Sequence, residues 1–195
     1  MTKRERLDKL NKKMSACSEC VLRMDCNRVV PGDGNPEAQI MFVGEAPGKK
    51  EDELGIPFVG AAGKFLNEML ASIGLKREDI YIANVVKCRP PQNRDPLPEE
   101  VAACWPWLQK QIEIIDPKLI VTLGRHSLNR FFPDLKISET HGKLFHAELP
   151  KIGRRNFYAL YHPAAALYNG SMREVLKKDF KKIPQIMKEF GNGRD

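Results

Sequence analysis

The stretch Ile40-Met41-Phe42-Val43-Gly44-Glu45-Ala46-Pro47-Gly48 joins an apolar run to a turn rich in glycine and proline. An apolar run this short, bounded by turn residues, predicts a buried β-strand that ends where the turn begins. The segment 157–161 repeats this arrangement, because it is followed directly by His162-Pro163-Ala164. In an open α/β sheet the carboxyl ends of the strands form the ligand crevice. We therefore expect these two distant turns to lie together at one site that holds a flat, polar ring.

Strands and helices alternate along most of the chain, after a charged, helix-prone segment at 1–14 and an irregular segment at 15–37. Apolar spacing predicts strands at 39–43, 80–86, 118–123 and 156–161, and helices at 61–73, 98–115, 125–132 and 172–190. This order predicts an α/β fold with a four-stranded, mainly parallel sheet, flanked by helices on both faces and preceded by a cysteine-containing segment. The 195 residues suit a single domain, with its core at about 15–185.

The composition indicates a globular protein with a basic surface. Lysine and arginine number 32 against 25 for aspartate and glutamate, which gives a formal net charge of +7. This excess favours a polyanionic partner such as nucleic acid, although a solvated basic surface accounts for it equally well. No apolar run approaches the ~18 residues of a membrane span, and the N-terminus lacks the apolar segment of a signal peptide. We expect no membrane association and a cytoplasmic protein, nucleoid-associated in a prokaryote.

The cysteines indicate a metal centre. There are five of them, and an odd count in a cytosolic chain argues against a disulfide framework. Cys17 and Cys20 form a C-x-x-C pair, and Cys88 and Cys104 can be brought to it from the region that follows the second predicted strand. A zinc ribbon normally has a second close pair, so this scattered spacing favours a 4Fe–4S cluster. Zinc, and buried cysteines without any metal, are the alternatives.

Three further residues have side chains that suit a binding site for a planar base. Phe58 lies between proline and glycine and is a candidate stacking platform, with core packing as the alternative. Asn84 ends the second predicted strand and offers a donor and an acceptor side by side, although a strand-end Asn also commonly caps a turn. His162 can donate a hydrogen bond to an oxyanion, or it can be a surface or capping histidine. We assign no role to the other three histidines, His126, His141 and His146.

The loops around these residues contain glycines, arginines and one exposed apolar candidate. Gly44 and Gly48 allow the backbone to approach a ligand closely, although an ordinary turn has the same composition. Arg89 and Arg94 lie in a stiff, proline-containing basic loop that can contact DNA phosphates. Leu167 can enter the space that an extruded nucleotide leaves in a base stack.

Taken together, these motifs resemble the family 4 uracil-DNA glycosylases, the iron–sulfur branch of the uracil-DNA glycosylase superfamily. The resemblance covers about residues 15–185 and rests on several motifs in the same order. They are Gly44-Glu45-Ala46-Pro47-Gly48, Glu51-Asp52, Pro57-Phe58-Val59-Gly60, Asn84, Cys88-Arg89-Pro90-Pro91 and Tyr161-His162-Pro163-Ala164. The family has a small parallel sheet between helices. Its four cluster cysteines match Cys17, Cys20, Cys88 and Cys104, while Cys26 has no counterpart.

The resemblance also implies roles for individual residues. By this matching Phe58 stacks on uracil, Asn84 reads the edge of the base, and His162 binds O2. Glu45 and Ala46 stand where better-studied relatives have Gln and a water-activating Asp, a departure that is shared by family 4 and leaves the general base unidentified.

The resemblance implies a basis for excluding thymine as well. Gly48 stands where some relatives place a bulky Tyr that keeps thymine out, and Glu51 takes over part of that exclusion. The predicted substrate-binding residues are therefore Gly44, Ala46, Gly48, Glu51, Phe58 and Asn84.

The implied activity is hydrolysis of the N-glycosidic bond of deoxyuridine in DNA, which releases uracil and leaves an abasic site. Glu45 and His162 are the predicted catalytic residues, and no lysine is evidently placed as a Schiff-base nucleophile, so the enzyme is predicted to be monofunctional. The partner is single- or double-stranded DNA that contains uracil. Replication or repair proteins are further candidate partners, and we expect a monomer. The alternatives are a non-catalytic iron–sulfur protein that binds nucleic acid and a zinc-dependent hydrolase of free nucleotides.

Overall fold

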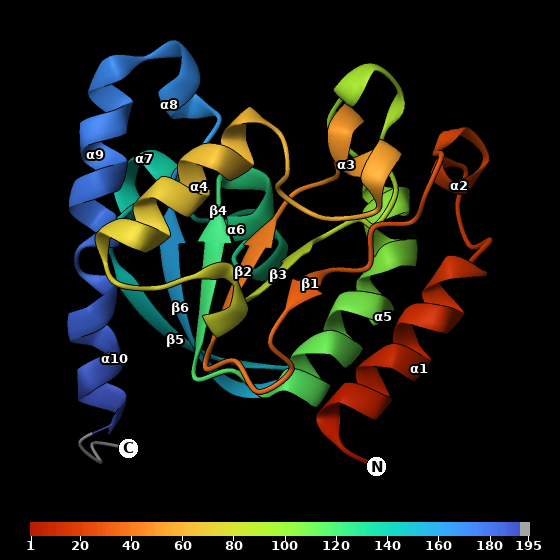
Figure 1. Ribbon diagram of the computed structural model, residues 1–195, viewed down its shortest axis with the longest axis horizontal. Coiled ribbons are helices and arrows are strands. Elements are labelled where there is room, and N and C mark those ends of the chain that lie inside the picture. Colours follow the sequence, from red (N-terminus) through yellow and green to blue (C-terminus); the bar gives the residue numbers. More distant parts are fainter. Residues whose placement is uncertain (192–195) are drawn as a thin grey trace.

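One mixed β-sheet, in the strand order β1-β3-β2-β4-β6-β5, forms the centre of the computed structural model, which describes residues 1–191 (Figure 1). The four central strands are parallel, and β1 and β5 pair antiparallel at the two edges. The strands are β1 (Asp33–Gly34), β2 (Ile40–Gly44), β3 (Tyr81–Asn84), β4 (Leu119–Leu123), β5 (Leu144–Leu149) and β6 (Gly153–Leu160).

The four predicted strands are confirmed as β2, β3, β4 and β6, and the sheet is two strands wider than the sequence indicated. Both additional strands are at edges. β1 is a single pair of residues, Asp33 and Gly34, with no apolar pattern. β5 is only partly buried along its length and is paired to β6 through a tight turn. An edge strand has a neighbouring strand on one side only, so it needs no continuous apolar run. Hydrophobic patterning therefore does not reveal such a strand.

Helices cover both faces of the sheet (Figure 1). The main ones are α1 (Lys3–Ser15), α4 (Ala61–Ser72), α5 (Pro98–Ile115), α6 (Arg125–Phe131), α9 (Gly170–Phe180) and α10 (Ile183–Gly191). Shorter ones are α2 (Leu22–Asp25), α3 (Lys49–Leu54), α7 (Ile137–Thr140), α8 (Ala165–Tyr168) and the 3₁₀ turns η1 (Arg77–Asp79) and η2 (Pro91–Asn93). The single helix expected at 172–190 is divided into α9 and α10, because Pro184 cannot donate a main-chain hydrogen bond and suits a helix start. Within residues 1–191, no helix combines the length and the apolar character that crossing a bilayer requires.

Alternate residues of each strand contribute to two separate cores. Met41 and Val43 of β2 pack in the core formed with α1 and α5. Ile40 and Phe42 pack in the core formed with α4, α9 and α10. Because successive strand side chains point to opposite faces, a strand covered on both sides must be apolar throughout. This explains why the strands that the sequence revealed are continuous apolar runs.

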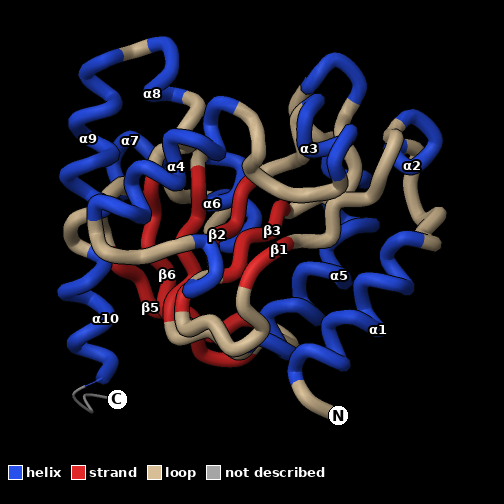
Figure 2. Tube along the Cα trace, in the orientation of Figure 1, coloured by secondary structure: helices blue, strands red, loops and turns tan. Residues whose placement is uncertain are grey.

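The parallel register brings the predicted site to the end of the sheet at which the central strands have their carboxyl ends. Gly44 of β2 pairs with Asn84 of β3, so the loops that follow these two strands start side by side. Leu123 of β4 pairs with Leu160 of β6 in the same sheet. The loops that follow β2, β3 and β6 extend along this end of the sheet, which lies at the top of Figure 2.

A matched pair of leucines tests this assignment of the core. Leu176 of α9 is fully buried, whereas Leu54 at the end of α3 is 57% exposed. We expect Leu176→Ala to lower the free energy of unfolding by about 2–5 kcal/mol, since it leaves a cavity. Leu54→Ala should change it by no more than about 0.5 kcal/mol. Urea unfolding monitored by circular dichroism measures both, and equal losses in the two variants would contradict the arrangement.

Candidate functional site

A cleft of about 360 Å³, open to solvent, lies at this end of the sheet. Its walls come from the segments that follow β2, β3 and β6, together with the start of α4. Eight residues that the sequence singled out line it: Glu45, Ala46, Gly48, Glu51, Phe58, Asn84, Arg94 and His162. The volume lies in the range of pockets that hold a small organic ligand. Residues that are far apart in the sequence therefore share one cavity, as the strand-end rule predicted.

The floor of the cleft is built from Gly44, Asn84 and Phe58. A Cβ atom on Gly44 would lie 2.4 Å from Asn84 Oδ1 and 2.8 Å from the Phe58 ring, so only glycine fits this position. Asn84 is 2% exposed. Its Oδ1 has no hydrogen-bond partner among the residues that the structure describes. A buried acceptor without a donor costs about 1–3 kcal/mol. This oxygen is therefore poised to accept a hydrogen bond from a ligand.

Phe58 is held in a strained conformation. Its φ of 52° lies in the left-handed region, which is a genuine outlier for a bulky residue. Arg77 donates hydrogen bonds to the carbonyls of Pro57 and Phe58, at 2.8 and 3.0 Å. Glu51 Oε1 accepts the two main-chain N–H groups that follow Phe58, at 2.9 and 2.8 Å. These four hydrogen bonds fix the main chain on both sides of the phenylalanine and so orient its ring.

His162 is a neutral hydrogen-bond donor in this setting. Its ring lies 5.5 Å from the Phe58 ring, centroid to centroid. Desolvation lowers the pKa of His162 to about 4, although the nearby Glu51 carboxylate opposes the shift. Nδ1 accepts the main-chain N–H of Ala164 at 3.1 Å. This bond assigns the proton of the neutral ring to Nε2, which is left to donate to a ligand.

A second polar group at the cleft was missed in the sequence. His126 Nε2 lies 3.1 Å from Asp95 Oδ2 and 3.9 Å from Oε2 of Glu45. The pKa of Glu45 is raised to about 7, by burial first and by Asp95 second, while Arg125 opposes the shift. His126 follows β4 by three residues, so the strand-end rule that identified His162 also applies to it. Because no motif adjoins His126 in the sequence, no role was predicted for it.

The three residues predicted to contact DNA are spread over a wider surface. Arg94 forms two hydrogen bonds with the buried Glu100 carboxylate, at 2.6 and 2.9 Å, which anchor its loop to α5. Arg89 Nε donates to Asn93 Oδ1 at 2.7 Å. Leu167 is 40% exposed on α8. Arg94 lines the cleft and the other two lie outside its lining, so their contact with DNA stays a prediction.

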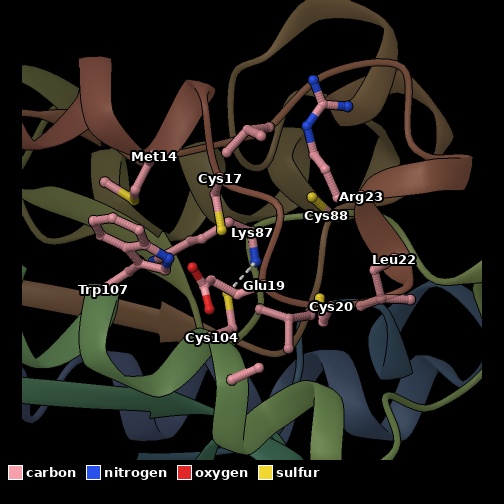
Figure 3. Close-up of a pocket in the computed structure, with 13 residues that line it drawn as sticks. Met14, Cys17, Glu19, Cys20, Leu22, Arg23, Lys87, Cys88, Cys104 and Trp107 are labelled. Atoms are coloured by element: carbon pink, nitrogen blue, oxygen red, sulfur yellow. Dashed lines mark hydrogen bonds between the residues drawn. The ribbon is translucent and has the colours of Figure 1, made fainter.

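The predicted metal-binding cysteines converge at a separate site beside α5 (Figure 3). Cys17 and Cys20 lie between α1 and α2, Cys88 follows β3, and Cys104 lies in the first half of α5. All four line one pocket, together with Met14 and Trp107 among others. The fold therefore assembles the predicted set from three separate parts of the chain.

In the part of the chain that the structure describes, these thiols are more widely spaced than the ligands of a single zinc ion. Four sulfurs bound to one zinc at about 2.3 Å would lie about 3.8 Å apart. Within residues 1–191, no three cysteine sulfurs lie within 4.8 Å of one another. Burial raises the pKa of Cys104 to about 11, although Lys87 opposes the shift, and burial also raises the pKa of Cys88. The main-chain N–H of Lys87 donates to Cys104 Sγ at 3.2 Å, as is common for cluster ligands.

Two neighbours of this centre, Cys26 and Lys87, are not among the four predicted ligands. Cys26 is buried and raises the pKa of the adjacent Cys88 thiol, after burial itself, but it does not line the pocket. Lys87 is completely enclosed, which lowers its pKa to about 8. Its Nζ donates to the main-chain carbonyl of Asn84 and to Gln111 Oε1, both at 2.7 Å. Lys87 thus contacts both the cysteine centre and the floor of the cleft.

Comparisons with known proteins agree with this arrangement. The family model described as "Uracil DNA glycosylase superfamily" matches residues 31–188. The type-4 uracil-DNA glycosylase of Archaeoglobus fulgidus is 50% identical over 188 residues, which cover 93% of this chain and 94% of that protein. The type-4 enzyme of Sulfurisphaera tokodaii is 48% identical, over 92% of this chain and 84% of its own length. That of Thermotoga maritima is 42% identical over 97% and 99% of the two chains.

Replacing Glu51 by Gln tests the hydrogen bonds that hold the Phe58 segment. The neutral amide accepts weaker hydrogen bonds than the carboxylate, by about 1 kcal/mol. We therefore expect amide exchange in a peptide that contains residues 57–63 to become about fivefold faster, as measured by hydrogen–deuterium exchange mass spectrometry. Glu53→Gln, on an exposed position of the same helix, is the control and should leave this peptide unchanged. Equal exchange in both variants would show that Glu51 does not restrain the segment.

Proposed function

The chain belongs to the type-4 branch of the uracil-DNA glycosylase superfamily and acts as a uracil-DNA glycosylase, and we propose how its own residues carry out the reaction. The observation that supports the proposal most strongly is the buried, unpartnered Oδ1 of Asn84 on the floor of a cleft that also holds Phe58 and His162. A uracil extruded from DNA would stack on Phe58 and meet both polar side chains with its edges. Extrusion itself costs a few kcal/mol, which contacts in the cleft must offset.

Asn84 selects uracil over cytosine. Oδ1 accepts N3–H of uracil, and the Asn84 amide N–H₂ donates to O4. Cytosine carries an amino donor where uracil has O4 and an acceptor where uracil has N3–H, so both contacts become unfavourable. A buried site built for hydrogen bonding rejects such an analogue strongly, because its polar groups are left unpaired.

Glu51 and Gly48 form the wall that excludes thymine in this proposal. A Cβ on Gly48 would lie 2.7 Å from Glu51 Oε2, so the carboxylate occupies the space that a side chain at residue 48 would need. The main-chain N–H groups of Val59 and Gly60 fix Glu51 from the other end. A fixed carboxylate beside the C5 edge of the base leaves no room for the methyl group of thymine.

His162 stabilises the leaving group. Cleavage of the glycosidic bond leaves the bonding electrons on uracil, and the negative charge spreads to O2. The neutral Nε2–H of His162 donates to O2, and the main chain of residues 44–48 surrounds the same anion. One preorganised donor of this kind contributes about 3–4 kcal/mol to transition-state stabilisation.

Glu45 is the general base of the proposed reaction. Water attacks C1′ of the oxocarbenium-like sugar, and its proton passes to the Glu45 carboxylate, which leaves an abasic site. A carboxyl group with a pKa of about 7 is suited to accept a proton near neutral pH. While ionised, the same carboxylate also stabilises the positive charge on the sugar.

Cys17, Cys20, Cys88 and Cys104 would hold a 4Fe–4S cluster. When bound, the cluster supplies four iron–thiolate bonds that join the segment before α2, the loop after β3 and helix α5. On the protein side, the N–H of Lys87 stabilises the Cys104 thiolate, and the apolar surroundings exclude water from the sulfurs. We propose that this cross-link shapes the DNA-facing surface near Arg89 and Arg94 rather than taking part in bond cleavage.

Asn84→Asp tests the recognition step. Aspartate replaces the donor that faces O4 with a second acceptor, so we expect single-turnover excision of uracil from an oligonucleotide to fall at least about 100-fold. DNA affinity, measured by fluorescence anisotropy, should stay within about twofold, since phosphate contacts dominate it. Asn35→Ala is the control, because Asn35 lies beside Ile80, at the end of β3 away from Asn84. Excision by Asn84→Asp at the wild-type rate would overturn the assignment.

A matched pair of cysteine variants tests the ligand set. We expect Cys88→Ala to lose the bound iron and the broad absorbance of the cluster at about 400 nm. Cys26→Ala should keep both. Iron analysis per chain and a visible spectrum give the readout. Full iron content in Cys88→Ala, or one zinc per chain in the wild-type protein, would refute the proposed centre.

A further inference from the structure

Glu45, His126 and Asp95 form a compact group beside the cleft, which Glu45 lines. One side-chain donor atom from each lies within 4.8 Å of the other two. The imidazole lies between the two carboxylates, with Nε2 at 3.1 Å from Asp95 Oδ2 and 3.9 Å from Glu45 Oε2. The three residues come from the loop after β2, the loop before α5 and the start of α6, so tertiary structure alone brings them together.

The surface exposure of the group increases outward from Glu45. The side chain of Glu45 is 26% exposed and that of His126 33%, while Asp95 is 59% exposed. Arg125 closes the outer side, since it donates to Asp95 Oδ2 at 3.0 Å and to His126 Nε2 at 2.9 Å. Nε2 of His126 therefore faces a donor, Arg125 Nε, and an acceptor, Asp95 Oδ2. Desolvation lowers the pKa of His126, which favours the neutral ring and leaves Arg125 as the positive charge beside the two carboxylates.

We propose that Asp95 and His126 are positioning residues for Glu45, which hold its carboxylate at the cleft and favour its acceptance of the water proton during excision. This inference rests on the proposed role of Glu45 as the base. Asp95 acts by its negative charge, which makes a second charge on Glu45 less favourable. His126 acts by contact, because its Nε2 lies close to both carboxylates and so limits the rotation of Glu45.

The charges around Glu45 predict shifts of opposite sign. The groups that face it are Asp95, whose charge favours the protonated form, Arg125, whose charge favours the ionised form, and the neutral His126. Excision needs the ionised form, so kcat/KM should fall tenfold per pH unit below the pKa of Glu45, which is about 7. Removing the Asp95 charge should move this acidic limb to lower pH. Removing the Arg125 charge should move it to higher pH.

The test is the pH dependence of kcat/KM for uracil excision by the cluster-containing protein and two matched variants. We expect Asp95→Asn to shift the acidic limb about one pH unit downward and Arg125→Gln to shift it upward by a similar amount. Both side chains are more than half exposed, at 59% and 65%, so both variants should fold. A purely structural role would lower activity without moving the limb in opposite directions. Shifts of the same sign, or no shift in either variant, would overturn the proposal.

His126 is tested by the size of the rate plateau above pH 8. We expect His126→Ala to lower kcat about tenfold with little change in KM, because the carboxylate of Glu45 loses its orientation. His126→Gln should keep most of the rate, since its amide can bridge the two carboxylates. His146→Ala is the control, because that ring lies on the edge strand β5 and bonds to Asn156 of β6. A wild-type plateau in His126→Ala would exclude the positioning role.

Glu45→Gln separates this inference from the proposed function on which it rests. Wild-type excision with an unchanged acidic limb in Glu45→Gln would show that Glu45 is not the base, and the proposed mechanism would fail. Loss of excision in Glu45→Gln, together with unshifted limbs in Asp95→Asn and Arg125→Gln, would refute only the role of Asp95.

Discussion

The close approach of Gly44, Asn84 and Phe58 is the constraint on which the rest of the cleft depends. Parallel pairing of β2 and β3 sets Gly44 opposite Asn84, and the absence of a side chain on Gly44 lets both neighbours reach the floor. Any Cβ at this position would displace the amide or the ring. The strained backbone of Phe58, fixed by Arg77 and Glu51, is compatible with this packing because four hydrogen bonds restrain it. The site is therefore rigid before a base arrives, which reduces the entropic cost of binding.

A buried lysine joins the cleft to the cysteine centre. The main chain of Lys87 contacts Cys104, and its ammonium contacts the carbonyl of Asn84. Gln111 completes the network, since it accepts from Lys87 and donates to the carbonyl of Pro31 and to the hydroxyl of Tyr81. Buried polar groups of this kind fix the structure only when every member has a partner. Asn84 on the floor of the cleft and the region of the predicted cluster cysteines thus share one hydrogen-bonded network.

The electrostatics of the cleft separate two roles within a small volume. Desolvation lowers the pKa of His162, so in the proposed mechanism its neutral ring donates to the developing anion. Glu45 has the opposite requirement, because a base must hold a proton tightly enough to remove it from water. Burial and the neighbouring Asp95 supply that affinity. The two groups lie in one cavity and are tuned by different neighbours, which is a common way to assign acid–base roles within an active site.

The sequence by itself determined the central strands, most of the helices and the residues that lie at the strand ends, because continuous apolar runs and terminal glycines reflect local rules of burial and backbone freedom. The same rules placed Phe58, Asn84 and His162 near one another. Only the tertiary structure revealed β1 and β5, which are edge strands without a buried pattern. It alone showed the charge environment of Glu45, because Asp95 and His126 approach through loops whose paths no local pattern encodes. Proximity across a fold depends on how the elements pack, and a pKa depends on that proximity.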